Sequence, residues 1–289
     1  MYLPDFDYYA PDNVAETCQL LAQFGPKAKV LAGGTDIITK MKKEVLAPEI
    51  LVSIKNLDQL KKIEYVPGQG LVIGARVTHN ELVKSEVVRK KYLSISTAAA
   101  QMAHNQVRNA GTVGGNISNA VPSADLPPVF IALNATVKIA GKNGERTLAL
   151  EDIFAGPSKT VLAQDEIITE LIIPDQKMTG SNYIKFGLRK SGALAVVGVA
   201  TAVQVENNVI KDARIVLGAV APTPVRAKKT EEFLKGKQVS DDVLVEAGLM
   251  ATGECKPISD IRASAEYRTD LVRVFTRRAL RKAIDEGHA

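Results

Sequence analysis

The chain has 289 residues, of which 46% are hydrophobic and 24% are charged, and its formal net charge is +5. This composition excludes a disordered chain, allows substantial cores, and at this length predicts two domains. No apolar run reaches the roughly 18 residues of a membrane span, and the first residues, MYLPDFDYYAPDN, lack the basic and apolar segments of a secretory signal. We therefore expect a cytoplasmic protein without a transmembrane segment.

Cysteine and histidine usage limits what this chain can hold by itself. Cys18 and Cys255 are widely separated, too few for a zinc site or an iron–sulfur cluster, and typical of a reducing compartment. His79, His104 and His288 show no metal-ligand spacing. We predict no metal site, whereas the positive charge permits a phosphate-bearing cofactor, a nucleic acid or an acidic protein face as partner.

The first 60 residues predict a strand–loop–helix–strand unit. Asp12 or Asn13 caps a first helix, which Gly25-Pro26 terminates. There follow a strand over 29–32, the pair Gly33-Gly34, a helix capped by Thr35 or Asp36 that ends near residue 43, and a strand over 50–54. The glycines thus lie between the carboxyl end of a strand and the amino end of a helix.

The pair Gly33-Gly34 has two interpretations. Glycines at this position let backbone N–H groups approach a phosphate without a Cβ atom in the way. The alternative is a tight turn with a purely structural role. The stretch contains neither GxGxxG nor GxxxxGK[ST], so by itself it does not decide between the two.

A second glycine-rich stretch, HNQVRNAGTVGGNISNAVPSADLPP at 104–128, strengthens the phosphate interpretation. Gly111, Gly114 and Gly115 stand among Asn, Ser and Thr residues. We predict a polar loop here, between an alanine-rich helix over 96–102 and an apolar helix over 126–133. Because such a loop buries little of its own, we expect a polar ligand to order it. The alternative is an Ω-like loop closed by its own hydrogen bonds.

The remaining elements are mainly strands up to residue 220 and mainly helices after Val225. Thr78-His79-Asn80-Glu81 has the spacing of a capping box. Met178 to Ser181 is predicted as a linker, and Asn207-Asn208 as a hairpin turn. Strands are predicted over 62–66, 71–75, 134–140, 145–150, 166–173, 183–188, 195–205 and 209–220, and a closing helix over 267–284.

Four stretches together have a recognisable pattern: AGGTD at 32–36, VRNAGTVGGNISNAVPSADLPP at 107–128, YIKFGLRKSGALAVVGVA at 183–200 and IRASAEYR at 261–268. In these stretches the chain resembles the FAD-binding medium subunits of molybdenum hydroxylases such as carbon monoxide, xanthine and nicotinate dehydrogenases. The resemblance runs essentially from end to end. It implies an α+β fold, with a two-lobed FAD-binding domain of the vanillyl-alcohol-oxidase (PCMH) type over 1–177. A C-terminal domain over 178–289 would contain a small antiparallel sheet packed against helices.

The resemblance also implies where non-covalently bound FAD lies. Asp125 would accept hydrogen bonds from a sugar or ribityl hydroxyl. Ile168 would lie beside the isoalloxazine ring, or be an ordinary core residue. Lys185 would lie near this ring and raise the flavin potential, or be a solvated lysine. Backbone groups of two stretches would cradle the diphosphate, with hydroxyl donors from the threonines: Val30, Leu31, Ala32, Gly33, Gly34, Thr35 and Asp36, and Gly111, Thr112, Val113, Gly114, Gly115 and Asn116.

The function implied by the resemblance is electron transfer, in which the flavin and no protein nucleophile performs the redox chemistry. Electrons would come from [2Fe-2S] clusters of a small partner subunit, after substrate oxidation at a molybdopterin centre in a large one, in a dimer of heterotrimers. They would pass to NAD+, a quinone or another acceptor. With two cysteines, this chain cannot itself hold the clusters.

Three other functions are considered. A stand-alone flavin oxidase needs its own acid/base pocket, and no such set of residues is evident. A non-redox assembly subunit that has lost FAD is disfavoured by both intact glycine stretches. A nucleic-acid binder would use the basic last helix, but the chain has no tryptophan, 5% aromatic residues and no known binding motif. Its cations are Arg273, Arg277, Arg278, Arg281 and Lys282.

Overall fold

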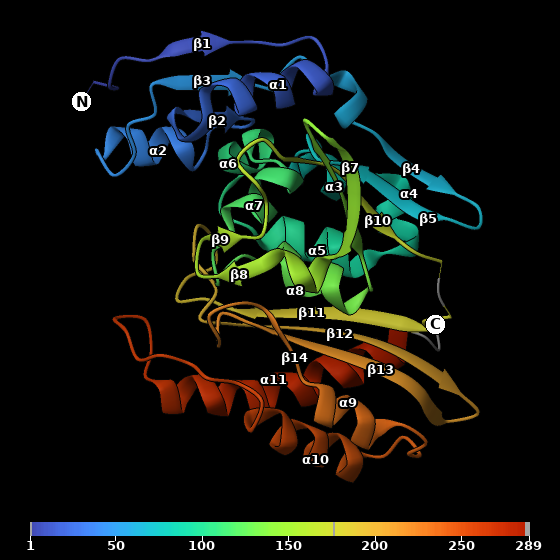
Figure 1. Ribbon diagram of the computed structural model, residues 1–289. Coiled ribbons are helices and arrows are strands. Elements are labelled where there is room, and N and C mark those ends of the chain that lie inside the picture. The colour runs from blue at the N-terminus through green and yellow to red at the C-terminus, as the bar shows by residue number, and fades with distance from the viewer. Residues whose placement is uncertain (1, 176, 287–289) are drawn as a thin grey trace.

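The computed structural model describes residues 2–175 and 177–286. A two-lobed N-terminal domain lies above a C-terminal domain in which three helices cover the lower face of a sheet (Figure 1). Among the described residues, no helix has the length and apolar character needed to cross a bilayer. The chain is thus the predicted combination of sheets and helices.

The first lobe contains the predicted strand–loop–helix–strand unit. A parallel sheet in the order β1-β3-β2 is formed by β1 (Asp7–Tyr9), β3 (Ile50–Ser53) and β2 (Ala28–Leu31), and it lies next to α1 (Val14–Phe24) and α2 (Ile37–Lys42). Asn13 caps α1, since its side chain accepts the N–H of Glu16 at 2.8 Å. Neither Thr35 nor Asp36 caps α2 through its side chain, which differs from the prediction.

The second lobe is built on an antiparallel sheet of five strands in the order β4-β5-β10-β6-β7. The capping box at Thr78 and Glu81 is present at the start of α3 (His79–Lys84). The strands are β4 (Ile63–Val66), β5 (Gly70–Gly74), β10 (Ile167–Ile173), β6 (Thr136–Gly141) and β7 (Gly144–Ala149). Helices α4 (Glu86–Lys91), α5 (Leu93–Gln101) and α8 (Leu126–Ala132) and the small hairpin β8 (Phe154–Gly156) and β9 (Lys159–Thr160) complete the lobe.

The polar stretch after residue 104 is helical, so its prediction as a loop was wrong. Residues Asn105–Ala110 form α6 and Val113–Asn119 form α7. Thr112 caps α7 by accepting the N–H of Gly115 at 3.1 Å. Val113 and Ile117, one turn apart, are fully buried in the core. These two apolar residues anchor a helix that the surrounding Asn, Ser and Gly content obscured.

The C-terminal domain consists of an antiparallel sheet in the order β11-β12-β13-β14 and three helices. Its strands are β11 (Gly180–Phe186), β12 (Val197–Glu206), β13 (Val209–Gly218) and β14 (Val225–Arg226), and its helices are α9 (Lys228–Leu234), α10 (Asp241–Thr252) and α11 (Ala265–Glu286). Asn207 and Asn208 have φ angles of 51° and 61°, as the predicted two-residue hairpin turn requires. β11 begins at Gly180, inside the predicted linker.

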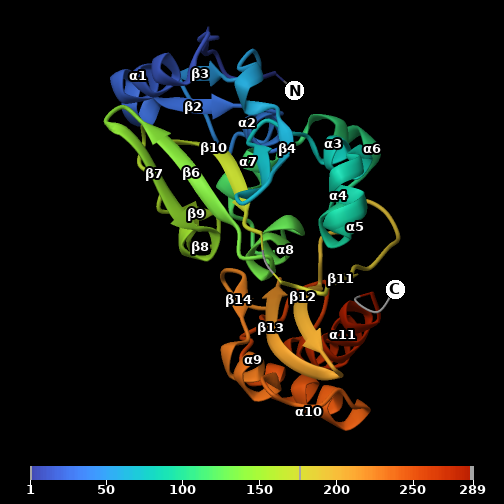
Figure 2. The same cartoon turned by 90° about the vertical axis from the view of Figure 1, so that its right-hand side faces the viewer.

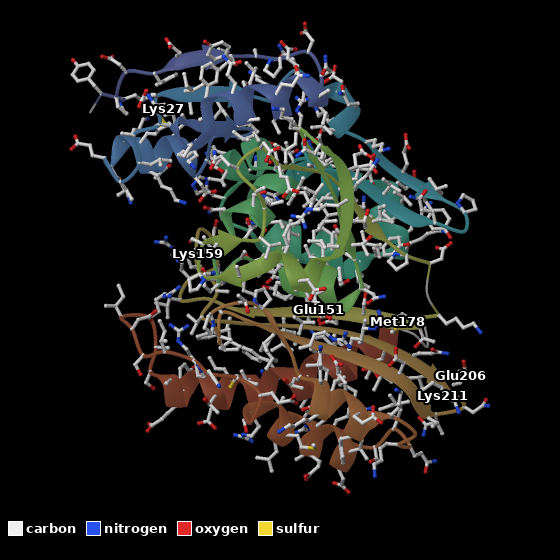
Figure 3. The ribbon with its side chains drawn as sticks, in the orientation of Figure 1. Lys27, Glu151, Lys159, Met178, Glu206 and Lys211 are labelled. Atoms are coloured by element: carbon white, nitrogen blue, oxygen red, sulfur yellow. The ribbon has the colours of Figure 1, made fainter. Side chains whose placement is uncertain are left out.

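The C-terminal sheet is buried on both faces, and this attaches the domains to each other (Figure 2). Alternate residues point to opposite sides: Ala200 and Ala202 join the core of the second lobe, whereas Val199 and Val203 join a core between the sheet and the C-terminal helices. Glu151, at the domain junction in Figure 3, lies 3.9 Å from Arg226 of β14. The two domains therefore share a continuous hydrophobic core at their interface.

The IRASAEYR stretch has a structural role. The Arg268 guanidinium is buried, donates to the carbonyl oxygens of Val196 and Ala219 at 3.1 Å, and lies 2.7 Å from the Asp260 carboxylate. A buried arginine paired in this way fixes the start of α11 against the sheet. This motif thus maintains the C-terminal domain.

Candidate cofactor site

A cavity of about 670 Å³ lies where the first lobe meets the second. The two glycine-rich stretches contact each other here. A Cβ atom at Gly33 would lie 1.8 Å from the carbonyl oxygen of Ala110, so only glycine allows this approach. The fold therefore brings together in one wall the two stretches that are about 80 residues apart along the chain.

The first stretch presents free backbone donors to the cavity. Gly34 has a φ angle of +73°, which an L side chain rarely adopts. The N–H groups of Gly34, Thr35 and Asp36 find no hydrogen-bond partner in the described part of the chain. Backbone donors without partners at a cavity wall suit an anion such as a phosphate group.

The second stretch contributes space and side chains, because its own backbone donors are already used. The N–H groups of Val113, Gly114 and Asn116 donate within the protein at 2.8–2.9 Å. Gly114 packs against Ala75, and an added Cβ atom there would lie 2.7 Å from the Cβ atom of Ala75. At Gly115 an added Cβ would approach only the Thr112 hydroxyl oxygen, at 2.9 Å. The expected cradle of backbone donors therefore comes mainly from the first stretch.

The rest of the cavity wall divides into apolar and polar parts. Ile168 lines it together with Ile54, Met102 and other apolar residues, and this surface suits a flat aromatic ring. Lys40 lines it from α2 and donates to the Asn119 side chain at 2.7 Å, which links the two lobes. Several lining residues were not among the predicted site residues, although Asn119 lies in the second glycine-rich stretch and His79 in the capping-box motif. They are Lys29, Lys40, Ile54, His79, Met102, Asn119, Ser158 and Leu162.

Four residues of the predicted site do not line this cavity: Leu31, Val113, Asp125 and Lys185. Leu31 lies under the glycine turn, where its Cδ1 atom would be 3.4 Å from a Cβ atom at Gly34. Val113 belongs to the core of the second lobe. The two charged residues form a separate network.

Asp125 and Lys185 form a buried ion pair across the domain interface. Lys185 Nζ lies 2.7 Å from one carboxylate oxygen of Asp125, and the Tyr183 hydroxyl donates to the other at 2.7 Å. The two charged side chains are only 6% and 7% exposed. Burial raises the pKa of the Asp125 carboxyl, although Lys185 and Tyr183 oppose this rise, and burial also raises the pKa of Tyr183. Each member of the network thus needs its partners.

His79 is a buried imidazole in the cavity wall. His79 is 2% exposed, and its Nδ1 atom has no hydrogen-bond partner among the residues that the structure describes. Burial, assisted by the nearby Arg108 guanidinium, lowers the pKa of His79 to about 4. The imidazole is therefore neutral at neutral pH.

We expect His79 to make the flavin-free protein sensitive to acid. Because its pKa is lower in the folded than in the unfolded chain, its contribution is fully present above pH 6.5 and is lost as the pH falls toward 4. The shift corresponds to about 3 kcal/mol of unfolding free energy. Urea unfolding from pH 7.5 to 4.5 measures this loss. His79→Gln should flatten the profile between pH 6.5 and 5, and an unchanged profile would contradict the assignment.

The residues present fit a dinucleotide with a diphosphate and an aromatic ring system. Free N–H groups and lysines lie in the same cavity as an apolar wall, and the buried Asn116 Oδ1 atom has no partner among the described residues. No group of three or more His, Cys, Asp or Glu residues suited to a metal ion occurs in residues 2–175 and 177–286. The donor set therefore favours a phosphate-bearing organic cofactor.

Comparison with known families identifies this cofactor domain. Residues 4–176 match the family described as the FAD binding domain in molybdopterin dehydrogenase, and residues 182–283 match the CO dehydrogenase flavoprotein C-terminal domain. The chain belongs to the FAD-binding medium subunits of the molybdenum hydroxylases. FAD is thus the cofactor of this domain.

Individual relatives match nearly the full length of this chain. The chain is 35% identical to the carbon monoxide dehydrogenase medium chain of Hydrogenophaga pseudoflava, over 98% of each chain. It is 28% identical to the xanthine dehydrogenase FAD-binding subunit of Escherichia coli O157:H7, over 96% of this chain and 95% of that one. A carbon monoxide dehydrogenase structure from H. pseudoflava superposes with a TM-score of 0.95, covers 99% of both chains and is 34% identical. The relatives are oxidoreductase subunits.

Proposed function

We propose that this medium subunit carries electrons from [2Fe-2S] clusters of a small partner subunit, through FAD, to NAD+, a quinone or another acceptor. A large partner subunit with molybdopterin would oxidise the substrate, in a dimer of heterotrimers. The observation that carries this proposal is the contact between the two glycine stretches at a cavity with free N–H donors and an apolar wall. Relatives named medium chains of dehydrogenases support the assembly.

In this proposal the two stretches divide the binding of FAD between them. The N–H groups of Gly34, Thr35 and Asp36 donate to the diphosphate, with the rest of Val30 to Asp36 forming the wall. Gly111 to Asn116 provide close approach, and Thr112 and Asn116 provide side-chain hydrogen bonds. Lys29 and Lys40 add positive charge. Ile168 packs against the isoalloxazine ring, because it belongs to the apolar wall.

The bound FAD supplies the electron-accepting and electron-donating chemistry. The protein's own contribution is to orient the cofactor and exclude water from its apolar side. Lys185, which does not line the cavity, would tune the flavin potential from outside its wall, and Asp125 would hold Lys185 in place. Because the Asp125 carboxylate lies 2.7 Å from the ammonium group, the pair has little net charge, and its effect on the potential would be smaller than that of an unpaired lysine.

An absorption spectrum of the purified protein tests the proposal first. We expect flavin bands, and FAD in the supernatant after acid or heat release, identified by chromatography. The native complex should then show reduction of this FAD by electrons from the partner clusters. A colourless protein that fails to take up added FAD would contradict the assignment. A free chain that is fully active on an organic substrate would instead favour a stand-alone oxidase.

A further inference from the structure

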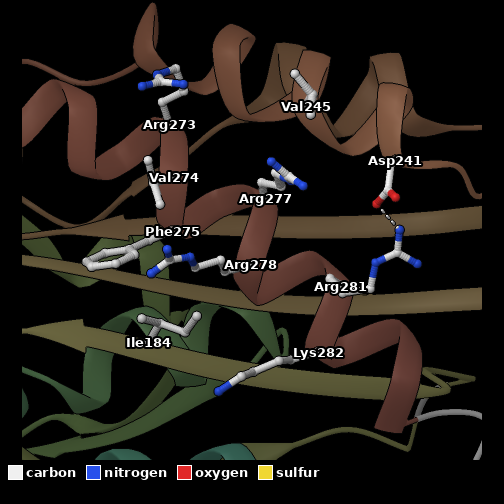
Figure 4. Close-up of a pocket in the computed structure, with 10 residues that line it drawn as sticks. All are labelled: Ile184, Asp241, Val245, Arg273, Val274, Phe275, Arg277, Arg278, Arg281 and Lys282. Carbon is white, nitrogen blue, oxygen red and sulfur yellow. Dashed lines mark hydrogen bonds and ion pairs between the residues drawn. The ribbon is translucent and has the colours of Figure 1, made fainter.

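A second cavity of about 800 Å³ lies in the C-terminal domain and shares no lining residue with the cofactor cavity. It forms a groove along α11, between α10 and the side of the sheet that carries β11 (Figure 4). Its lining residues comprise five cations, one carboxylate and four apolar residues: Arg273, Arg277, Arg278, Arg281 and Lys282; Asp241; and Ile184, Val245, Val274 and Phe275. We call this feature the α11 groove.

The positive charge of the α11 groove is only partly compensated. Arg281 pairs with Asp241 at 2.5 Å and Arg273 with Asp270 at 3.7 Å. Arg277, Arg278 and Lys282 are exposed and form no ion pair within the described residues. Arginines at positions 273, 277 and 281 are one helical turn apart, so like charges repel one another along the helix by a few tenths of a kcal/mol per pair. An acidic ligand would remove this repulsion.

The α11 groove also has apolar surface beside its charges. Val245 lines it from α10 and is 46% exposed, and Leu249, one turn further on, is 56% exposed. Helices α10 and α11 pack closely at Gly248. A Cβ atom there would lie 2.5 Å from the carbonyl oxygen of Arg273, so only glycine allows this approach. Apolar residues beside charged ones are typical of protein–protein interfaces.

We propose that the α11 groove docks an acidic, amphipathic segment of a partner polypeptide. The carboxylates of this segment would pair with Arg277, Arg278 and Lys282, and its apolar side chains would cover Val245 and Leu249. A nucleic acid would match the charges only, because the groove offers no exposed aromatic ring for base stacking, Phe275 being 7% exposed. The partner is another subunit of the complex, so this inference rests on the proposed function.

Carbodiimide cross-linking of the native complex tests the proposal directly. This reagent joins a lysine amine to a carboxylate that is already in contact with it, and Lys282 is the lysine of the groove. We expect mass spectrometry to find Lys282 joined to an Asp or Glu of a different subunit. A link to a second copy of this chain, no intersubunit link at Lys282, or isolation of this chain free of other subunits would overturn the proposal.

A charge-reversal variant provides the energetic test. Arg277→Glu/Arg278→Glu should weaken assembly by at least about tenfold in Kd at low ionic strength, with a smaller difference at high salt. The matched control, Lys211→Glu/Lys229→Glu, makes the same charge change at exposed positions outside the groove, with Lys211 near the β12–β13 turn (Figure 3). Equal assembly of the two variants would overturn the proposal. It would also be overturned if nuclease treatment abolished the difference in assembly between them, because a nucleic acid would then be the ligand of the groove.

Flavin content separates this inference from the proposed function. Both double variants change residues outside the cofactor cavity, so we expect both to keep FAD. If the unmodified protein lacks FAD, the proposed function fails, whatever the cross-linking shows. If FAD is retained but Lys282 has no carboxylate partner in another subunit, only the docking of an acidic segment fails.

Discussion

Gly115→Asp is expected to reduce the affinity for FAD by at least about 100-fold. The substitution places a carboxylate at the cavity wall where we propose that the diphosphate binds, and two like charges roughly 4 Å apart near a protein surface repel each other by about 4 kcal/mol. Beyond the backbone of its own helix, an added Cβ would approach, among the described residues, the Thr112 hydroxyl oxygen at 2.9 Å, and a small shift of this side chain relieves the contact. The fold should therefore survive while FAD binding is lost.

Gly115→Asn is the matched control, because it has the same size as aspartate without its charge. Titration of the flavin-free proteins with FAD, followed by flavin fluorescence, gives the affinities, and circular dichroism reports the fold. We expect the asparagine variant to bind FAD much more tightly than the aspartate variant. Stoichiometric FAD in purified Gly115→Asp would refute the proposed diphosphate position.

Lys185→Met is expected to lower the free energy of unfolding by about 3 to 5 kcal/mol. It leaves the Asp125 carboxylate buried with only the Tyr183 hydroxyl as a partner, and an unpaired buried charge is costly. The deficit should be largest near pH 7.5 and smaller near pH 5, because protonation of Asp125 removes the charge. Urea unfolding at the two pH values measures it.

The double variant Asp125→Asn/Lys185→Met tests whether the missing partner is the cause. We expect it to recover much of the lost stability, since neither charge remains. A single variant as stable as the unmodified protein would show that the pair contributes little. Redox titration of the double variant then measures the influence of the pair on the flavin potential without a large folding defect.

Short-range patterns were sufficient for most of the elements. The capping box at Thr78 and the Asn207-Asn208 turn depend on neighbouring residues, and both are present as predicted. The helical stretch around α7 was missed because its stability comes from Val113 and Ile117 packing in a core assembled from distant segments. Local composition does not predict such a helix, because tertiary packing overrides helix propensity.

The candidate site, too, was only partly predictable from local patterns. The sequence predicted the class of cofactor through its resemblance to a known family. Its two predicted glycine stretches contain 11 of the residues that line the cavity, because glycine at a close backbone approach leaves a local signature. Only the tertiary structure decided that Gly33 meets Ala110, that His79 lies in the cavity wall, and that Lys185 pairs with Asp125. These relations join residues about 30 to 80 positions apart. They follow from how two lobes and a second domain pack, which no local pattern specifies.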